Sequence, residues 1–285
     1  MERLSTDKKV VRGEAGINFA MSNYIEFKVR PVIKYFGGKS FLARRIIELI
    51  PDSDIYVEPF AGGLNVLLNK CKYGLEIVND INPELIHLYE TVRDNSSVLL
   101  DRLREIPYTE EVFKRALSIG VVDDPIERAL NFLIKHRMSR SGMGDDFSKL
   151  SDEEDSGSWD NLPDDLKFTA HRLKDVEFYN KPAMELIECY DVSRTSFYLD
   201  PPYYPSTRTA PKVYEYEMTP LQHLLLLRRI RTCCGNVIIS GYDHPIYNRE
   251  LKGWEKYSFE VSNHSAQTKV KSKRVEVVWV KSRGL

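Results

Sequence analysis

The residues best suited to chemistry are Asp200-Pro201-Pro202-Tyr203, which directly follow an apolar run at 196–199. Two consecutive prolines fix two φ angles and remove two N–H donors, so the Asp200 carboxylate and the Pro201 carbonyl can be held as acceptors that face one point. Two such acceptors beside an aromatic ring suit a planar base that carries an NH2 group: the acceptors take its two hydrogens, and Tyr203 stacks on its face. The same hydrogen bonds would make the amino nitrogen more nucleophilic toward a sulfonium methyl group. The tetrapeptide therefore predicts a catalytic loop that acts on the amino group of adenine.

A plainer interpretation of the tetrapeptide is a turn that ends a strand, because Pro and Asp are common in turns. Its position favours catalysis, since open α/β sheets bind ligands beyond the carboxyl ends of their strands. Two further motifs of the chain support the same interpretation.

The first of these motifs is Glu58-Pro59-Phe60-Ala61-Gly62-Gly63, a glycine turn between a predicted strand and a helix. Such a turn lets the ribose and carboxylate of a nucleoside approach the backbone. Asp80 ends the next predicted strand 18 residues after Gly62, close to the roughly 20-residue offset at which an acid reaches ribose hydroxyls in dinucleotide folds. The alternative for Asp80 is an acid at a helix N-terminus, which explains less of the pattern.

The second motif, Tyr35-Phe36-Gly37-Gly38-Lys39-Ser40, ends like a phosphate loop. Ile33 stands where the first glycine of that loop would be required, so ATP is not expected to bind. An aromatic residue, two glycines and a lysine before a helix could instead hold the aromatic and carboxylate parts of S-adenosylmethionine.

Basic residues gather in two places, although the net charge of -1 gives no general indication of a nucleic-acid partner. The first cluster is Lys135-His136-Arg137 with Arg140, beside Ser141, and the second comprises Lys269, Lys271, Lys273 and Arg274. Each is large enough for several phosphate contacts, and a solvated face is the alternative. For the first cluster we favour DNA, because it lies in the region that we interpret below as an inserted domain, beside Ser139, Ser141, Gly142 and a polar loop.

The order of predicted elements indicates an α/β fold. Apolar strands alternate with helices at both ends of the chain, which favours parallel pairing and an open, doubly wound, Rossmann-like sheet. Between 95 and 174 the strand signal disappears, and helical stretches at 98–103 and 126–138 indicate an inserted helical domain. We therefore expect an arm at 1–30, a core formed by 31–94 and 176–285, and a target-recognition insertion at 95–175.

Several classes of protein are not expected from the composition. The 285 residues are 42% hydrophobic and 29% charged, without an apolar run long enough to span a membrane. The first thirty residues lack the features of a secretory signal, which favours a cytoplasmic location. The cysteines show no CxxC pair or matching histidine spacing, so we expect buried thiols rather than a disulfide or a metal site; they are Cys71, Cys189, Cys233 and Cys234.

With these motifs in their order, the chain resembles the Dam-like family of adenine-specific DNA methyltransferases over most of its length after the arm. The resemblance implies a class I methyltransferase core, S-adenosylmethionine as methyl donor, and an adenine flipped out of double-stranded DNA. It implies cofactor contacts from Tyr35, Lys39, Glu58, Phe60, Gly62, Gly63, Asp80 and Asp200. It also implies DNA contacts from the helical segment 132–143, and thus from Lys135, His136, Arg137, Arg140 and Ser141. Residues 240–242 and 274–276 are similar to one branch of the family.

Two positions depart from the family pattern: Leu64 replaces a common glycine, and Pro182-Ala183 stands where many members have an acid followed by phenylalanine. Asn180 is a candidate to replace the missing acid. The alternatives to DNA adenine methylation are the same chemistry on an amino group of cytosine, RNA or protein, or a DNA-binding relative without catalysis. No pattern in the sequence identifies a partner restriction endonuclease.

Overall fold

The computed structural model describes residues 29–35, 37–39, 41–120, 122–149, 159–208, 215–262 and 273–281. Most of the expected arm lies outside these residues, as do Phe36, Ser40, Lys269 and Lys271. For Lys273 and Arg274 only the backbone is described.

A seven-stranded sheet forms the centre of the described chain, in the order β3-β2-β1-β4-β5-β7-β6. The first five strands in this order are parallel, and β7 is antiparallel to both β5 and β6. The bounds are β1 Ile55–Glu58, β2 Leu75–Asn79, β3 Val176–Tyr179, β4 Thr195–Leu199, β5 Asn236–Tyr242, β6 Glu255–Ser262 and β7 Lys273–Lys281. The strand order reverses between β1 and β4, which is where doubly wound sheets bind ligands. The expected Rossmann-like α/β core is confirmed.

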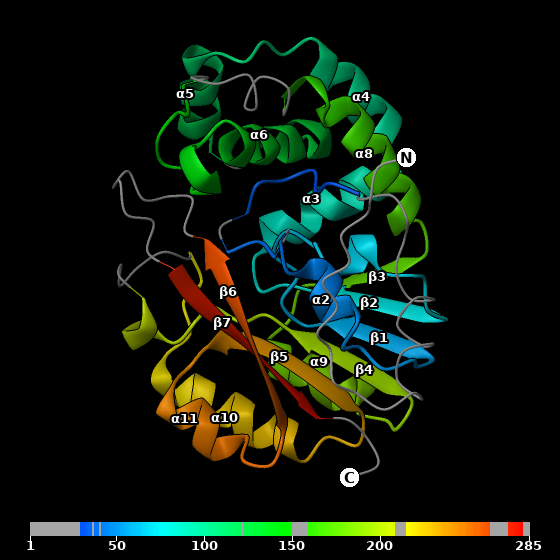
Figure 1. Ribbon diagram of the computed structural model, residues 1–285. Coiled ribbons are helices and arrows are strands. Elements are labelled where there is room, and N and C mark those ends of the chain that lie inside the picture. Colours follow the sequence, from blue (N-terminus) through cyan, green and yellow to red (C-terminus); the bar gives the residue numbers. More distant parts are fainter. Residues whose placement is uncertain are drawn as a thin grey trace, which may run out of the picture.

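Helices cover both faces of the sheet (Figure 1). One face carries α2 Ala43–Ile47, η1 Leu67–Asn69, α3 Pro83–Asp94, α4 Ser96–Arg104, α5 Glu110–Ser118, α6 Pro125–Arg137 and α8 Leu162–Leu173. The other carries α9 Ala183–Tyr190, α10 Pro220–Arg231 and α11 Pro245–Glu250. Successive strand residues point to opposite faces, so Tyr56 joins the first hydrophobic core and Val57 the second.

The helices α4, α5, α6 and α8 lie together at the top of Figure 1, and α3 packs between them and the sheet. A buried charge cluster attaches this group to the sheet. Arg172 of α8 donates two hydrogen bonds to Glu76 of β2, at 2.5 and 2.8 Å, and Lys70 pairs with the same carboxylate. The group also shares one hydrophobic core with α2 and α3. The proposed boundary at residue 95 therefore falls between two helices of one packed layer.

Two local features differ from the sequence expectations. The pattern predicts a helix over 64–71, whereas a turn and the short η1 occur there; the left-handed φ of 54° at Leu64 excludes this residue from a helix. Of the cysteines, only Cys233 is buried, while Cys189 and Cys234 are exposed and Cys71 is intermediate.

Among the described residues, no helix combines the length and apolar character that a membrane span requires.

Candidate active site

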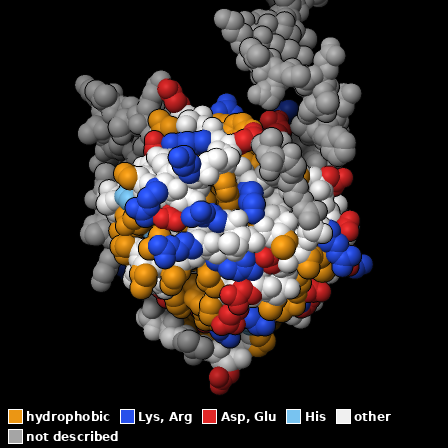
Figure 2. Space-filling model, turned by 90° about the horizontal axis from the view of Figure 1, so that it is seen from below, with side chains coloured by type: hydrophobic (Ala, Val, Ile, Leu, Met, Phe, Trp, Pro, Cys, Tyr) orange, Lys and Arg blue, Asp and Glu red, His pale blue; other side chains and the backbone are white. Residues whose placement is uncertain are grey.

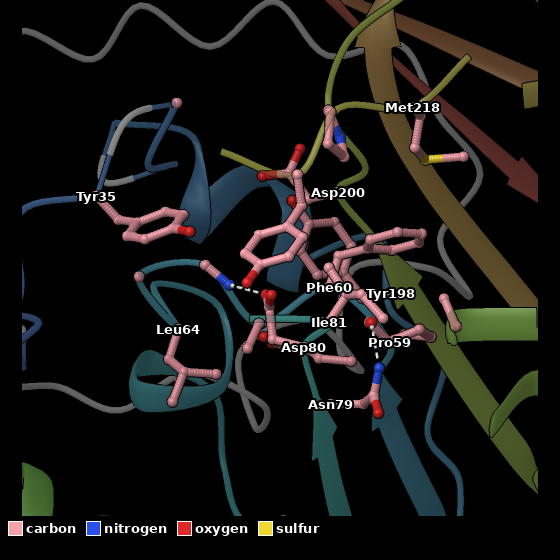
Figure 3. A pocket seen from close by; sticks show the side chains of 18 of the residues that line it. Tyr35, Pro59, Phe60, Leu64, Asn79, Asp80, Ile81, Tyr198, Asp200 and Met218 are labelled. Atoms are coloured by element: carbon pink, nitrogen blue, oxygen red, sulfur yellow. Dashed lines mark hydrogen bonds between the residues drawn. The ribbon is translucent and has the colours of Figure 1, made fainter. Parts of the chain in front are cut away.

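Three acidic residues meet at the carboxyl edge of the sheet. Glu58 ends β1, and Asp80 and Asp200 directly follow β2 and β4, which flank β1 on either side. A cavity of about 470 Å³ opens at this edge. Figure 3 shows side chains from all three strand ends around it, with Tyr35 and Met218 on opposite sides.

The cavity brings together every residue predicted to contact the cofactor. Its lining includes Tyr35, Lys39, Glu58, Phe60, Gly62, Gly63, Asp80 and Asp200. Apolar side chains close the rest of the wall, among them Ile81, Pro182, Ala183, Met184, Met218, Leu225 and Leu226. A pocket that combines backbone of a glycine turn, acidic groups and an apolar wall suits a nucleoside that carries a charged amino-acid tail.

The Asp80 carboxylate fixes the glycine turn against the following helix. It accepts hydrogen bonds from the backbone N–H of Gly62, at 3.2 Å, and of Asn82, at 2.9 Å. Burial raises the pKa of Asp80 to about 6. The amide of Asn180 donates to the Asp80 carbonyl, at 2.8 Å. Asn180 does not line the cavity, so the structure does not bring it to the place of the missing acid.

The side chain of Asn79 connects two walls of the cavity. Its amide donates to the carbonyl oxygens of Pro59 and Lys181, both at 3.0 Å. Pro59 opens the glycine turn, and Lys181 precedes Pro182, so one buried amide sets the position of both segments. The apolar Pro182-Ala183 pair thus lines the cavity where the family pattern has an acid and phenylalanine.

Glu58 and Leu64 stand at the two ends of the glycine turn, and both line the cavity. Glu58 is buried and accepts a hydrogen bond from the Tyr56 hydroxyl at 2.5 Å, and burial raises the pKa of Glu58 to about 8. Leu64 adopts the left-handed conformation for which glycine is better suited, and its side chain is 1% exposed. The leucine therefore keeps the turn geometry and gains burial at the cost of backbone strain.

The Asp200 carboxylate is held by groups from two directions. Lys39 Nζ lies 3.0 Å from Asp200 Oδ2, and the Ser240 hydroxyl donates to Asp200 Oδ1 at 3.1 Å. Tyr198 and Ser240 are joined through their hydroxyls at 3.0 Å. Burial raises the pKa of Asp200, Lys39 lowers it and Glu276 raises it further. The acid is thus rigidly placed, with a reduced preference for the ionised form.

Tyr203 lies beside Asp200 but does not line the cavity. Its ring is 6% exposed and meets Tyr242 edge-on, at 4.6 Å between centroids. Its hydroxyl donates to Glu276 Oε2 at 2.8 Å. Pro202 lines the cavity, whereas Pro201 does not.

The residues predicted to contact DNA are not equally accessible. Arg140 and Ser141 are exposed and Lys135 is half-buried, whereas His136 and Arg137 are only 7% and 6% exposed. His136 Nδ1 donates to the Gly142 carbonyl at 2.9 Å, and Arg137 lies 4.0 Å from Asp165. His136 thus supports the turn η2 Arg140–Gly142, which carries the two exposed side chains, whereas Arg137 faces Asp165 of α8.

Further basic side chains lie on the helices that cover the other face of the sheet. The elements α10 and α11 are at the bottom of Figure 1, and from that side Lys and Arg side chains gather among hydrophobic ones (Figure 2). Arg231 and Arg249 of these helices both pair with Glu250. Both arginines thus have a carboxylate partner within the protein, and we assign them no nucleic-acid contact.

The sequence analysis did not identify several residues of the site. Ser240 and Glu276 belong to segments whose likeness to the family is weak, yet both contact the predicted catalytic loop, at Asp200 and Tyr203. Tyr198 and Met218 line the cavity without any motif that marks them.

The family described as D12 class N6 adenine-specific DNA methyltransferase matches residues 35–270. The chain belongs to this family. Membership confirms the expected class of enzyme, a DNA adenine methyltransferase. The alternatives of cytosine, RNA or protein as substrate find no support in this family's description.

Individual relatives agree with the family. The DNA adenine methylase of Haemophilus influenzae is 27% identical over 190 residues, which are 63% of this chain and 66% of the relative. The type II methyltransferase M.MjaIII of Methanocaldococcus jannaschii is 26% identical over 209 residues, 64% of this chain and 72% of the relative. The DNA adenine methylase of Salmonella typhi is 28% identical over 191 residues, 64% of this chain and 68% of the relative. Among solved structures, the rRNA methyltransferase aviRa from Streptomyces viridochromogenes is similar with a TM-score of 0.37, at 11% identity over 86% of each chain.

Proposed function

We propose that this DNA methyltransferase transfers a methyl group from S-adenosylmethionine to the exocyclic N6 of an adenine flipped out of double-stranded DNA. The observation that carries the proposal is the position of Asp200. Its carboxylate stands at the carboxyl end of β4, at the wall of a nucleoside-sized cavity, and is held by Lys39 and Ser240. Asp80, Glu58 and the glycine turn face the same cavity.

S-adenosylmethionine, when bound, supplies an electrophilic methyl group on a sulfonium. The chain offers it the glycine turn for close backbone approach, Asp80 for the ribose hydroxyls, and the apolar wall around Ile81 and Pro182 for the adenine ring. Tyr35 and Lys39 would close the opposite side. With Pro182-Ala183 in place of an acid and phenylalanine, the ring is held mainly by apolar contact.

Asp200 and the Pro201 carbonyl are the acceptors proposed for the two amino hydrogens of the target base. Held in this way, the amino nitrogen would offer its lone pair to the methyl group, and the bound sulfonium would keep the electron pair of the C–S bond. The nitrogen then loses one proton, and Asp200, which accepts that N–H and whose pKa is raised, is placed to receive it. Tyr203 is proposed to stack on the base, which requires its buried ring to present a face to the cavity.

The turn η2 is proposed as the part that meets DNA. Its exposed Arg140 and Ser141 are suited to phosphate or base contacts, and Lys135 lies beside them. His136 and Arg137 are reassigned from direct contact because their side chains are buried: His136 supports this turn, and Arg137 faces Asp165 of α8. Because DNA is the proposed substrate, we also propose an intracellular location for the protein.

Mass spectrometry of digested nucleic acid tests this function. The purified chain is incubated with S-adenosylmethionine and, in parallel, with duplex DNA, single-stranded DNA and RNA from a source without adenine methylation. The expected product is N6-methyladenosine as its deoxynucleoside, with duplex DNA as the best substrate. Methylated cytosine, or product from RNA alone, would overturn the proposal.

A further inference from the structure

Glu276 of β7 occupies a position in which it contacts the catalytic loop without lining the cavity. It pairs in register with Tyr242 of β5, and its carboxylate is 15% exposed. Tyr203 donates its hydroxyl to Glu276 Oε2 and meets Tyr242 with its ring edge. One cross-strand pair therefore fixes the catalytic tyrosine at two points.

The same carboxylate faces the ammonium that holds Asp200. Lys39 Nζ lies 3.0 Å from Asp200 Oδ2 and 3.8 Å from Glu276 Oε2, and it donates to the Gly37 carbonyl at 2.8 Å. It also lies 4.7 Å from the centroid of the Tyr203 ring. One ammonium thus stands between two carboxylates, in surroundings from which most water is excluded.

In the proposed reaction, the target amino group must reach an Asp200 carboxylate that other groups already contact. The incoming amino group must donate a hydrogen to Asp200, where the Ser240 hydroxyl engages one oxygen and the Lys39 ammonium the other. An ammonium that draws back from Asp200 in a largely buried site needs another counter-ion, because an unpaired buried charge is strongly unfavourable. Glu276 is the carboxylate already within reach.

We propose that Glu276 is a positioning residue of the methyl-transfer site: it orients Tyr203 through its hydroxyl and receives the Lys39 ammonium when the target amino group engages Asp200. This inference rests on the proposed function. It assigns Glu276 a role through its charge as well as through its hydrogen bond, and the two parts are separable by substitution.

Glu276→Gln keeps an oxygen that can accept the Tyr203 hydroxyl and removes the charge. Tyr203→Phe removes the hydroxyl and leaves the charge. Glu255→Gln is a matched control, because Glu255 lies on β6 of the same sheet and accepts a hydrogen bond from Tyr257, but is exposed. Steady-state kinetics on duplex DNA and thermal unfolding would be measured for all three.

For Glu276→Gln we expect kcat to fall 10- to 100-fold, with KM for S-adenosylmethionine changed less than about threefold and the thermal midpoint close to that of the wild type. The acid limb of the pH profile of kcat should also shift to lower pH, because the Glu276 charge raises the pKa of Asp200. Charged or titratable groups near Asp200 that remain in this variant are Lys39, Glu58, Tyr198 and Tyr247. Tyr203→Phe should lower kcat without that shift, and Glu255→Gln should match the wild type.

A Glu276→Gln variant with the kcat and pH profile of the wild type would overturn the inference and leave the proposed function intact. A fall in kcat with an unmoved acid limb would overturn the part played by the charge. If the wild-type chain forms no methylated adenine on duplex DNA, the proposed function fails, and this inference fails with it. A Glu276→Gln variant that unfolds where Glu255→Gln does not would show a structural role instead.

Discussion

The carbonyl oxygen of Lys34 lies only 2.3 Å from where a Cβ on Gly142 would stand. Gly142 also has a φ of 72°. Both this backbone conformation and the neighbouring Lys34 carbonyl therefore restrict the position to glycine. This contact joins the turn that carries Arg140 and Ser141 to the segment that leads into Tyr35. The proposed DNA-contacting turn and the proposed cofactor pocket therefore share a backbone contact.

Gly142→Ala should be destabilising and should lower methylation. We expect the substitution to cost roughly 2 kcal/mol more than Gly253→Ala, because Gly253 has a φ of 93° but nothing within 4 Å of its added Cβ. Urea unfolding of both variants measures the difference, and equal losses of stability would contradict the contact. Activity should fall at least tenfold in Gly142→Ala but not in Gly253→Ala.

The buried imidazole of His136 predicts a pH-dependent stability difference. Burial lowers its pKa from 6.5 to about 4, so its contribution is complete above pH 6.5 and is lost as the pH falls toward 4. A His136→Gln variant lacks this titration, so the deficit in its unfolding free energy relative to wild type should shrink by roughly 2 kcal/mol between pH 7 and pH 4.5. His223, whose pKa is also lowered to about 4, should behave alike on replacement. A deficit that stays constant with pH would contradict the burial of a neutral imidazole.

The backbone strain at Leu64 predicts that glycine is a more stabilising replacement than alanine there, which is the reverse of the usual order. Leu64→Gly should be about 1 kcal/mol more stable than Leu64→Ala, because only glycine relieves the left-handed backbone. Leu67 is equally buried but lies in η1, and there alanine should be the more stable by about 0.5–1 kcal/mol. Chemical unfolding of the four variants compares the two orders. The same order at both positions would argue against strain at Leu64.

Loss of the Lys39 ammonium should move the pH profile in the direction opposite to loss of Glu276. Asp200 must be ionised to accept the amino hydrogen, and its pKa is raised by burial and lowered by Lys39. Activity therefore falls as the pH falls through this raised pKa. Lys39→Met should shift the acid limb of kcat to higher pH, whereas Lys39→Arg should retain the wild-type limb. The measurement is kcat against pH at saturating cofactor.

The meeting of Glu58, Asp80 and Asp200 was predictable from the sequence, because each residue ends an apolar strand and alternation with helices indicates parallel pairing. Parallel strands present their carboxyl ends at one edge, so the three acids had to come together there. The same argument places the glycine turn between β1 and β2. These are consequences of local patterns that repeat along the chain.

The partnership of Tyr203 with Glu276 was not predictable in this way. Seventy-three residues separate the two, and their contact depends on the register between β5 and β7. The burial of His136 and Arg137 likewise follows from how α6 packs, since a basic run reads the same whether it is exposed or internal. The conformation of Leu64 was hidden because its apolar neighbours continue a helical pattern.

The most direct measurement of the role of Asp200 compares the wild type with Asp200→Ala, each expressed in a host that lacks adenine methylation. The host DNA is then sequenced by a method that reports modified bases, and calorimetry checks that the variant still binds S-adenosylmethionine. We expect methylated adenines in one short motif with the wild type, and background levels with the variant at cofactor affinity within about tenfold of wild type. Methylation by Asp200→Ala at the wild-type level would contradict the assignment of Asp200 as the residue that engages the target amino group.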